Sequence, residues 1–266
     1  MIHCAHMVPI QQGALRFLQF ETLAVPDVAH AIFTRHGGVS PEPYASLNLS
    51  VSTGDAKENV RHNIGLAFGA MERDPATRAD LWQVHSAAVV VAEHPNGPDG
   101  HLGQADALIT DRPGVSLFLR FADCLAVMIY DPRRRVVGIA HAGWRGSLKK
   151  VAKATVEAMA QRYGSQPADL VAGVGPGIGP CHYAVGPEVV AQTRQAFNGV
   201  SDSLLSTRNG EYYLDLWSAN RAALQEAGVE QIEVAGICTV CHSDDFFSHR
   251  ATGGRTGRFG GIIGLR

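Results

Sequence analysis

Short apolar runs alternate with amphipathic stretches along the chain, and turn residues separate them. Runs rich in β-branched and other apolar residues predict strands at 29–35, 79–84, 87–92, 115–120, 125–130, 135–140, 170–174, 232–237 and 259–265. Helices are predicted over 59–69, 147–163, 187–197 and 216–227, and glycines follow the second and the fourth, as is common at helix ends. Without a visible linker, repeat or low-complexity segment, the pattern predicts one α/β domain spanning 1–266.

Residues with metal-binding or catalytic side chains lie where the predicted strands stop. His85 stands between two predicted strands, Cys124 separates two apolar runs, and His141 follows the run 135–140. In α/β folds, functional sites form at strand ends and in the loops beyond them. The pattern therefore makes these three residues the first candidates for a site.

Composition and charge narrow the possible partners. Hydrophobic residues make up 45% of the chain and charged residues 18%, which is typical of a globular protein. Lys and Arg number 23 against 25 Asp and Glu, so no basic excess favours nucleic acid. The longest apolar stretch, 115–130, contains Arg120 and Asp123, which argues against a membrane span.

Cysteine usage indicates a reducing compartment. The start of the chain, 1–20, lacks the basic and apolar segments of a signal peptide. The five cysteines are an odd number, which favours free thiols over a disulfide framework: Cys4, Cys124, Cys181, Cys238 and Cys241. The expected location is the cytoplasm.

His85, Cys124 and His141 could together bind zinc, because imidazole and thiolate are both zinc ligands. Three protein ligands would leave a fourth position for water or substrate, as in catalytic zinc sites. The long intervals between them match no zinc-finger spacing. On spacing alone, a packed cysteine with two surface or capping histidines is the favoured interpretation.

Two further motifs are ambiguous. The segment 238–242 reads as the haem attachment pattern C-x-x-C-H, but no export signal and no second C-x-x-C accompany it, so coincidence within a loop is the favoured interpretation. The glycine-rich segment 175–180 matches a dinucleotide-binding fingerprint only in part, and is interpreted as a sharply turning loop.

Several arginines stand near glycines, where a guanidinium and free backbone amides could bind an oxyanion or phosphate. They are Arg35, Arg145, Arg250, Arg255 and Arg258. For any single one of them, a solvated loop charge is the simpler interpretation.

The order of short motifs from about residue 29 onward resembles bacterial purine nucleoside phosphorylases formerly catalogued as multicopper polyphenol oxidases, or laccase domain proteins. The motifs are Phe33-Thr34-Arg35-His36-Gly37-Gly38, Ser46-Leu47-Asn48-Leu49, Gln83-Val84-His85, Ala105-Asp106-Ala107, Ala122-Asp123-Cys124, His141-Ala142-Gly143-Trp144-Arg145-Gly146 and Phe246-Phe247-Ser248. Two positions depart from the family pattern: Ile64 replaces an arginine, and no acidic residue closely follows Arg250.

The resemblance implies a fold, a metal and an activity. It implies a mixed-sheet β-sandwich flanked by helices, similar to a toxin deamidase domain, with zinc rather than copper bound by His85, Cys124 and His141. The implied reactions are phosphorolysis of adenosine, inosine, guanosine and methylthioadenosine, and deamination of adenosine. It also removes the haem interpretation, since the family has a Cys-Thr pair where Cys238-Thr239 stands.

Within this interpretation, Arg35, Asn48, Arg145 and Arg250 are candidate phosphate or nucleoside contacts. Asp106 and Asp123 are candidates to orient the zinc-binding imidazoles. Three alternatives stay open: a copper oxidase of phenols, a cysteine hydrolase of a cell-wall precursor with Cys124 as nucleophile and His141 as base, and a metal-binding module without turnover.

Overall fold

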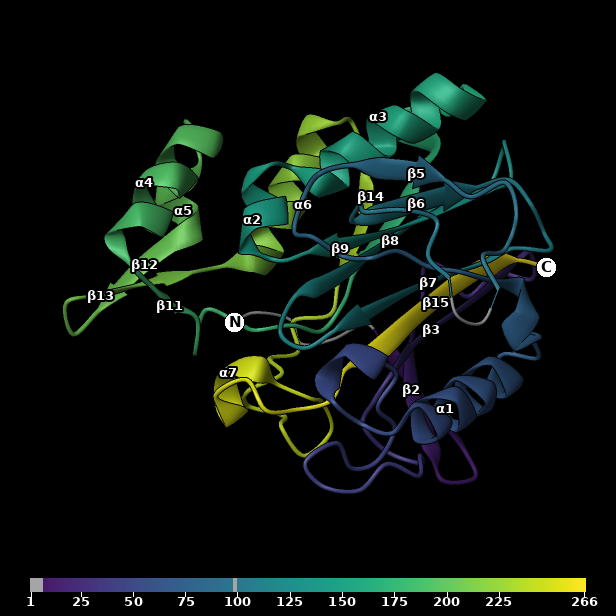
Figure 1. Cartoon of the computed structure of the whole chain (residues 1–266). Coiled ribbons are helices and arrows are strands. Elements are labelled where there is room, and N and C mark those ends of the chain that lie inside the picture. Colours follow the sequence, from purple (N-terminus) through teal and green to yellow (C-terminus); the bar gives the residue numbers. More distant parts are fainter. Residues whose placement is uncertain (1–6, 98–99) are drawn as a thin grey trace.

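The computed structural model describes residues 7–97 and 100–266, and Cys4 lies outside this range. Within these residues, two six-stranded sheets form the centre of the molecule (Figure 1). The first sheet runs β1 (Met7–Gln12), β2 (Leu15–Phe20), β3 (Val28–Phe33), β15 (Phe259–Leu265), β7 (Ser116–Phe121) and β4 (Arg78–Ala79). The second sheet runs β14 (Gln231–Val234), β10 (Val171–Val174), β8 (Leu125–Asp131), β9 (Val136–Ala142), β6 (Ala107–Thr110) and β5 (Val89–Val91).

Both sheets are mixed, and helices lie on their outer faces. The helices are α1 (Lys57–Ala70), α2 (Trp144–Leu148), α3 (Val151–Tyr163), α4 (Pro187–Ala196), α5 (Ser201–Leu204), α6 (Leu216–Glu226) and α7 (His249–Thr252), with short 3-10 turns at Val51–Thr53, Pro75–Thr77 and Pro167–Asp169. Parallel pairs join β4 to β7, β10 to β14 and β5 to β6, and the other neighbours in the two sheets are antiparallel. The expected mixed α/β architecture is confirmed, whereas the likeness to a toxin deamidase domain stays a prediction.

Successive side chains of a strand point to opposite faces of the sheet, and this alternation explains how the sheets and helices are layered. In β3, Val28 and Ile32 join the core between the two sheets, while Ala29 and Phe33 join the core beneath α1. In β9 the inner face carries Val137 and Ile139, and the opposite face packs with α3 and α6. The order of layers is therefore α1, first sheet, second sheet, and then α3 with α6 (Figure 1).

Several element boundaries differ from the sequence prediction. The helix expected over 147–163 is two helices, because Lys150 adopts the left-handed conformation with φ +56° and breaks the hydrogen-bond ladder between α2 and α3. The apolar period continues across this two-residue break at 149–150, so the pattern cannot reveal it. The strand expected over 79–84 ends at Ala79, and β9 continues through His141 to Ala142. The β1–β2 hairpin was not predicted, because most of β1 is exposed or half-buried.

A small third sheet of β11 (Ala184–Val185), β13 (Glu211–Leu214) and β12 (Leu205–Arg208) projects to one side with α4 and α5 (Figure 1). Its β12–β13 hairpin turns at Asn209 and Gly210, both with positive φ. No helix among the described residues is long and apolar enough to cross a membrane.

Candidate active site

Two connections between the sheets bring His85 and Cys124 together. The chain passes from the first sheet to the second between β4 and β5, and again between β7 and β8. His85 lies in the first connection and Cys124 at the end of the second. His141 lies near the end of β9, and one ligand atom of each of the three residues lies within 4.8 Å of the others.

The position of His141 follows from strand geometry. It continues the inner-face series Val137 and Ile139 on β9, so its ring enters the space between the sheets. There it lies 5.7 Å from the ring of Phe121, and the ring of His85 meets it edge-on at 5.0 Å between centroids. His141 is buried, whereas His85 and Cys124 are half-buried and reach toward the surface.

Asp106 holds both histidines in place. Its buried carboxylate accepts hydrogen bonds from the His141 Nδ1 at 2.9 Å and from the backbone amide of His85 at 3.0 Å. The amide and hydroxyl of Ser86 also donate to it, at 2.6 and 2.8 Å. Because Asp106 engages Nδ1 of His141, Nε2 is the ring nitrogen left for a ligand. These contacts also support the left-handed backbone of His85, whose φ is +58°.

Gly143 is needed because the backbone passes close to the site. A Cβ atom at this position would lie 2.8 Å from the Cys124 Sγ and 3.0 Å from the His85 Cδ2. The motif His141-Ala142-Gly143 thus supplies one candidate ligand and leaves room for the other two.

Mutual charge shifts the titration of this group. Burial raises the pKa of the Cys124 thiol, but the charges and hydrogen bonds of His141 and His85 outweigh burial and lower the pKa to about 6. Burial opposes protonation of His141, and its partners Cys124 and Asp106 nevertheless raise its pKa to about 9. Burial also disfavours the Asp106 carboxylate, yet hydrogen bonds from His141 and Ser86 lower its pKa to about 2. At neutral pH the group therefore favours a Cys124 thiolate beside a protonated His141, which in turn contacts the Asp106 carboxylate.

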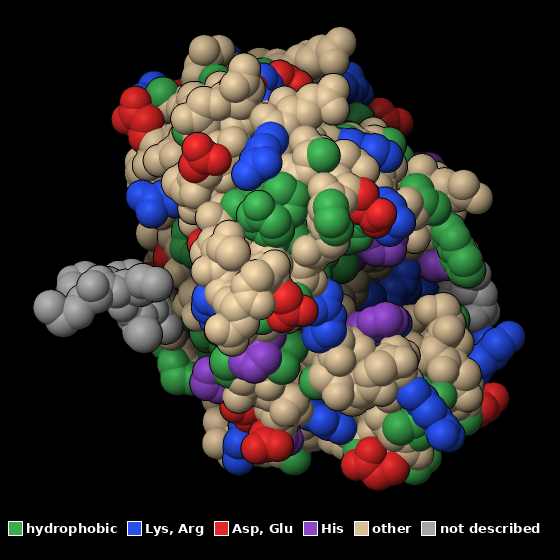
Figure 2. Space-filling model, turned by 90° about the vertical axis from the view of Figure 1, so that its left-hand side faces the viewer, with side chains coloured by type: hydrophobic (Ala, Val, Ile, Leu, Met, Phe, Trp, Pro, Cys, Tyr) green, Lys and Arg blue, Asp and Glu red, His purple; other side chains and the backbone are tan. Residues whose placement is uncertain are grey.

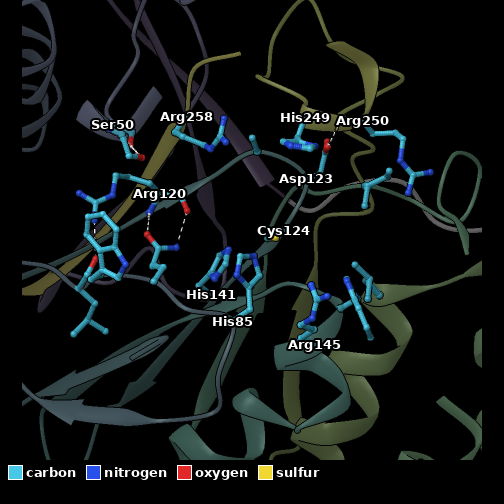
Figure 3. Close-up of a pocket in the computed structure, with 18 of the residues that line it drawn as sticks. Ser50, His85, Arg120, Asp123, Cys124, His141, Arg145, His249, Arg250 and Arg258 are labelled. Carbon is cyan, nitrogen blue, oxygen red and sulfur yellow. Dashed lines mark hydrogen bonds between the residues drawn. The ribbon is translucent and has the colours of Figure 1, made fainter. Parts of the chain in front are cut away.

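The group opens into a pocket of about 510 Å³, a size typical of small-molecule sites. Figure 2 shows a hollow in this face with basic and histidine side chains in its walls. In Figure 3, Arg145 approaches from the side of His85, while Arg250 and His249 lie on the side of Asp123. The lining also includes Ser50, Trp82, Gln83, His101, Arg120, Tyr183 and Arg258.

Two of the four expected substrate contacts line this pocket, namely Arg145 and Arg250. Arg145 is exposed, with its guanidinium 4.4 Å from the ring centre of Trp144. Arg250 lies over the ring of Tyr183 and donates to the carbonyl of His182 at 3.1 Å.

The other two expected contacts do not line it. Arg35 donates to the carbonyls of Ala45 and Ser243, at 2.8 and 3.0 Å, and so ties two loops together. Asn48 is fully buried and accepts a hydrogen bond from the backbone amide of Arg258 at 2.9 Å. Both are loop-holding residues in this structure, because their polar atoms are used within the protein.

Asp123 also differs from expectation. Its carboxylate accepts from the Thr239 hydroxyl and from the backbone amide of Arg250, both at 2.6 Å, and not from the imidazoles. It therefore holds the segment that carries Arg250 against the pocket. Of the two predicted orienting carboxylates, Asp106 alone contacts an imidazole in the described contacts.

Sequence reasoning missed Trp82, Arg120, Tyr183 and His249. Trp82 was placed inside a predicted strand, but β4 ends before it, and its side chain is 54% exposed at the pocket. In the sequence, Arg120 interrupts an apolar stretch and gave no sign of a role in the site. In the structure, its guanidinium forms an ion pair with the Asp80 carboxylate at 3.1 Å. The neighbouring Phe246-Phe247-Ser248 motif was the available signal for His249.

The donor set of this site suits a metal ion. Two imidazoles and one thiol lie close enough for one ion to bridge them, and the pocket leaves a further position open. Nitrogen and sulfur donors fit zinc, and three protein ligands with one open position are typical of catalytic zinc.

Comparison with known proteins places the chain in a family. Residues 29–266 match the family model described as "Multi-copper polyphenol oxidoreductase laccase". A protein of Deinococcus radiodurans named "Purine nucleoside phosphorylase" is 42% identical over 94% of this chain and 93% of its own length. The Escherichia coli protein named "Purine nucleoside phosphorylase YfiH" is 36% identical over 90% and 94%.

A solved structure agrees with these relatives. The crystal structure of YlmD from Geobacillus stearothermophilus has a TM-score of 0.91 and 33% identity, and the match covers 98% of this chain and 99% of that one. The chain therefore belongs to the laccase-domain family whose relatives bear the names YfiH and YlmD.

Proposed function

We propose that the chain is a zinc-dependent purine nucleoside phosphorylase whose metal is held by His85, Cys124 and His141. The observation that carries the proposal is the pocket itself, which places this His/Cys group and exposed Arg145 on one cavity. The names of the relatives support the substrate class. Adenosine, inosine, guanosine and methylthioadenosine are the proposed nucleosides.

Phosphorolysis needs an anion site next to the ribose. A phosphate oxygen forms a bond to the ribose C1′, the bond from C1′ to the purine nitrogen breaks, and the purine takes up a proton as it leaves. Arg145 is the proposed phosphate contact, because its exposed guanidinium can make paired hydrogen bonds to phosphate oxygens. Arg250 supplies further positive charge from another side of the same pocket.

The chain's own groups also suit hydrogen bonding and base binding. Burial, followed by the charge of Cys124, raises the pKa of Tyr183, so its hydroxyl stays protonated at neutral pH and can donate a hydrogen bond to a ligand. Exposed Trp82 offers a flat apolar face on which a purine can stack. Asp106 fixes the orientation of His141. When bound, zinc would supply a Lewis acid at the open position of the three-ligand group.

Deamination of adenosine is the proposed second reaction of the same pocket. Water adds at the purine C6, the bond from C6 to the amino nitrogen breaks, and ammonia leaves, which yields inosine. This reaction needs no phosphate. The two reactions are therefore separable by their products.

The test is product analysis after incubation of zinc-loaded protein with adenosine, with and without phosphate. We expect phosphate-dependent adenine and ribose 1-phosphate, and phosphate-independent inosine. Cys124→Ala should abolish both, while Arg162→Ala, which removes an exposed charge on α3, should retain both. If zinc-loaded protein forms neither adenine nor inosine, the proposal is contradicted.

One observation favours a second candidate, a cysteine hydrolase acting on a cell-wall precursor. Cys124, His141 and Asp106 form a thiol–imidazole–carboxylate series in which Asp106 holds the imidazole at 2.9 Å. That enzyme would be blocked by thiol alkylation and would survive chelation of metal. A copper oxidase of phenols would instead contain copper in the purified protein.

A further inference from the structure

A second group of thiol and imidazole side chains lies beside the pocket, on two loops far apart in sequence. Cys181 and His182 belong to the loop between β10 and β11, and Cys238 and Cys241 to the turn that follows β14. The four ligand atoms all lie within 4.8 Å of one another. The pocket lining includes their neighbour Tyr183 but none of the four.

The individual distances match the edges of a metal tetrahedron. The Cys181 and Cys241 sulfurs are 3.6 Å apart, and the His182 Nδ1 lies 3.3, 3.7 and 3.4 Å from the sulfurs of Cys181, Cys238 and Cys241. Tetrahedral zinc with ordinary bond lengths separates two sulfurs by about 3.8 Å and a sulfur from a nitrogen by about 3.6 Å. Three thiols and one imidazole therefore lie close enough together to share one ion.

The backbone around these side chains holds the two loops in register. Gly177 and Cys238 form a parallel bridge, and the amide of Thr239 donates to the carbonyl of Gly177 at 3.0 Å. The amide of Gly179 donates to the Cys238 sulfur at 3.3 Å, a contact that stabilises a thiolate. Cys238 is buried, while Cys181 and Cys241 are exposed, so an ion can enter from solvent.

We propose that Cys181, His182, Cys238 and Cys241 form a second zinc site, separate from the one in the pocket. Four protein ligands leave no open position, which is the arrangement of a structural rather than a catalytic zinc. The second C-x-x-C that a zinc ribbon would require is replaced here by the adjacent pair Cys181-His182. A site of this kind needs no nucleoside chemistry, so it stands apart from the proposed function.

The location of the site gives it a consequence for the pocket. The backbone carbonyl of His182 accepts a hydrogen bond from the Arg250 guanidinium, and Tyr183 is the next residue along the chain. An ion bound by the four side chains would fix the loop that carries both contacts. The second site is therefore a positioning device for one wall of the pocket.

Zinc content per chain tests the proposal directly. Reduced protein, loaded with zinc and freed of excess, should contain two zinc ions by elemental mass spectrometry. Cys181→Ser/Cys241→Ser should contain one, Cys124→Ala should contain one, and their combination none. His242→Ala is the matched control because this exposed histidine adjoins Cys241 but is not part of the group, and it should retain two.

Cobalt substitution tests the second metal site by absorption spectroscopy, without an activity measurement. In the Cys124→Ala background, Co²⁺ should give a thiolate-to-cobalt charge-transfer band and tetrahedral visible absorption, both lost in Cys181→Ser/Cys241→Ser. Equal zinc content in the wild type and in Cys181→Ser/Cys241→Ser would overturn the proposal. So would a Cys181–Cys241 disulfide, seen as a loss of two hydrogens in the mass of freshly purified protein.

Discussion

At Gly143 the segment after β9 passes so close to Cys124 and His85 that even a methyl group would collide with both. We predict that Gly143→Ala displaces these side chains and lowers zinc affinity at the pocket at least about tenfold, as disturbance of supporting residues commonly does. Competition with a chromogenic chelator measures the affinity. Gly186→Ala is the matched control, because a Cβ there meets no atom within 4 Å. Equal affinities for both variants would contradict the prediction.

The exposed indole of Trp82 is predicted to bind the purine base. Trp82→Ala should lower kcat/KM for adenosine. The loss of transition-state stabilisation calculated from that decrease should be about 1–3 kcal/mol, the range for base stacking on an aromatic side chain. Val200→Ala removes another exposed apolar side chain, and should leave the kinetics unchanged. Steady-state kinetics with varied adenosine decide the matter, and a Trp82→Ala variant with wild-type kcat/KM would exclude the stacking role.

His30 is predicted to make stability depend on pH. Burial lowers its pKa from 6.5 to about 4, and its Nε2 accepts from the amide of Phe20 at 2.9 Å. The unfolded chain binds a proton below pH 6.5 and the native state does not, so stability falls as pH drops. The expected loss from this residue is about 3 kcal/mol between pH 7 and pH 4. Urea unfolding of wild type and His30→Gln at both pH values should show a shallower dependence in the variant; equal slopes would refute this.

The sequence suggested most candidate ligands but not their geometry. His85, Cys124 and His141 stand out together as chemically capable residues at strand ends, yet their long spacing alone favoured separate structural roles, and the resemblance was needed to favour a shared metal site. Arg35 and Asn48 belong to matching motifs, but such motifs do not distinguish a residue that binds substrate from one that holds a loop. Cys181 and Cys238 could not be paired from spacing, since a bridge between two loops brings them together.

At the scale of elements, α6 depends on Asp215, the N-cap residue that precedes it. The Asp215 carboxylate accepts from the amide of Ser218 at 3.0 Å, and capping contacts of this kind contribute about 1 kcal/mol. Asp215→Ala should lower the free energy of unfolding by about that amount, while Asp215→Asn should retain most of it. Chemical denaturation of the three proteins measures the difference. Equal losses for Ala and Asn would show that the cap is not the cause.

Element prediction succeeded where burial is deep and failed at edges and breaks. The strand 259–265 and the helix 216–227 were recovered almost to the residue, because the strand is a continuous buried run and the helix has a clear apolar period. The exposed β1 strand lacks such a period, and a single left-handed residue, Lys150, divides a helix without altering the apolar face. Those features depend on local backbone conformation and on tertiary pairing.

At the scale of the whole molecule, the site in the pocket links both sheets through the two connections that carry His85 and Cys124. We predict that zinc stabilises the whole fold, by about 2.7 kcal/mol when free zinc is roughly 100 times Kd. The measurement is thermal unfolding with and without zinc in the Cys181→Ser/Cys241→Ser background, which isolates this site. Adding Cys124→Ala should remove the rise in Tm, and a rise that persists would place the stabilising ion elsewhere.

The turn at Asn209 and Gly210 offers a practical use of the projecting third sheet. Its hairpin points away from the two main sheets (Figure 1), while β11 in the same sheet begins directly after Tyr183. A fluorophore attached at this turn would sit outside the pocket, yet on an element joined to one of its walls. We predict that the light emission of such a label changes when a ligand fills the pocket, which would turn the protein into a sensor for its own ligands.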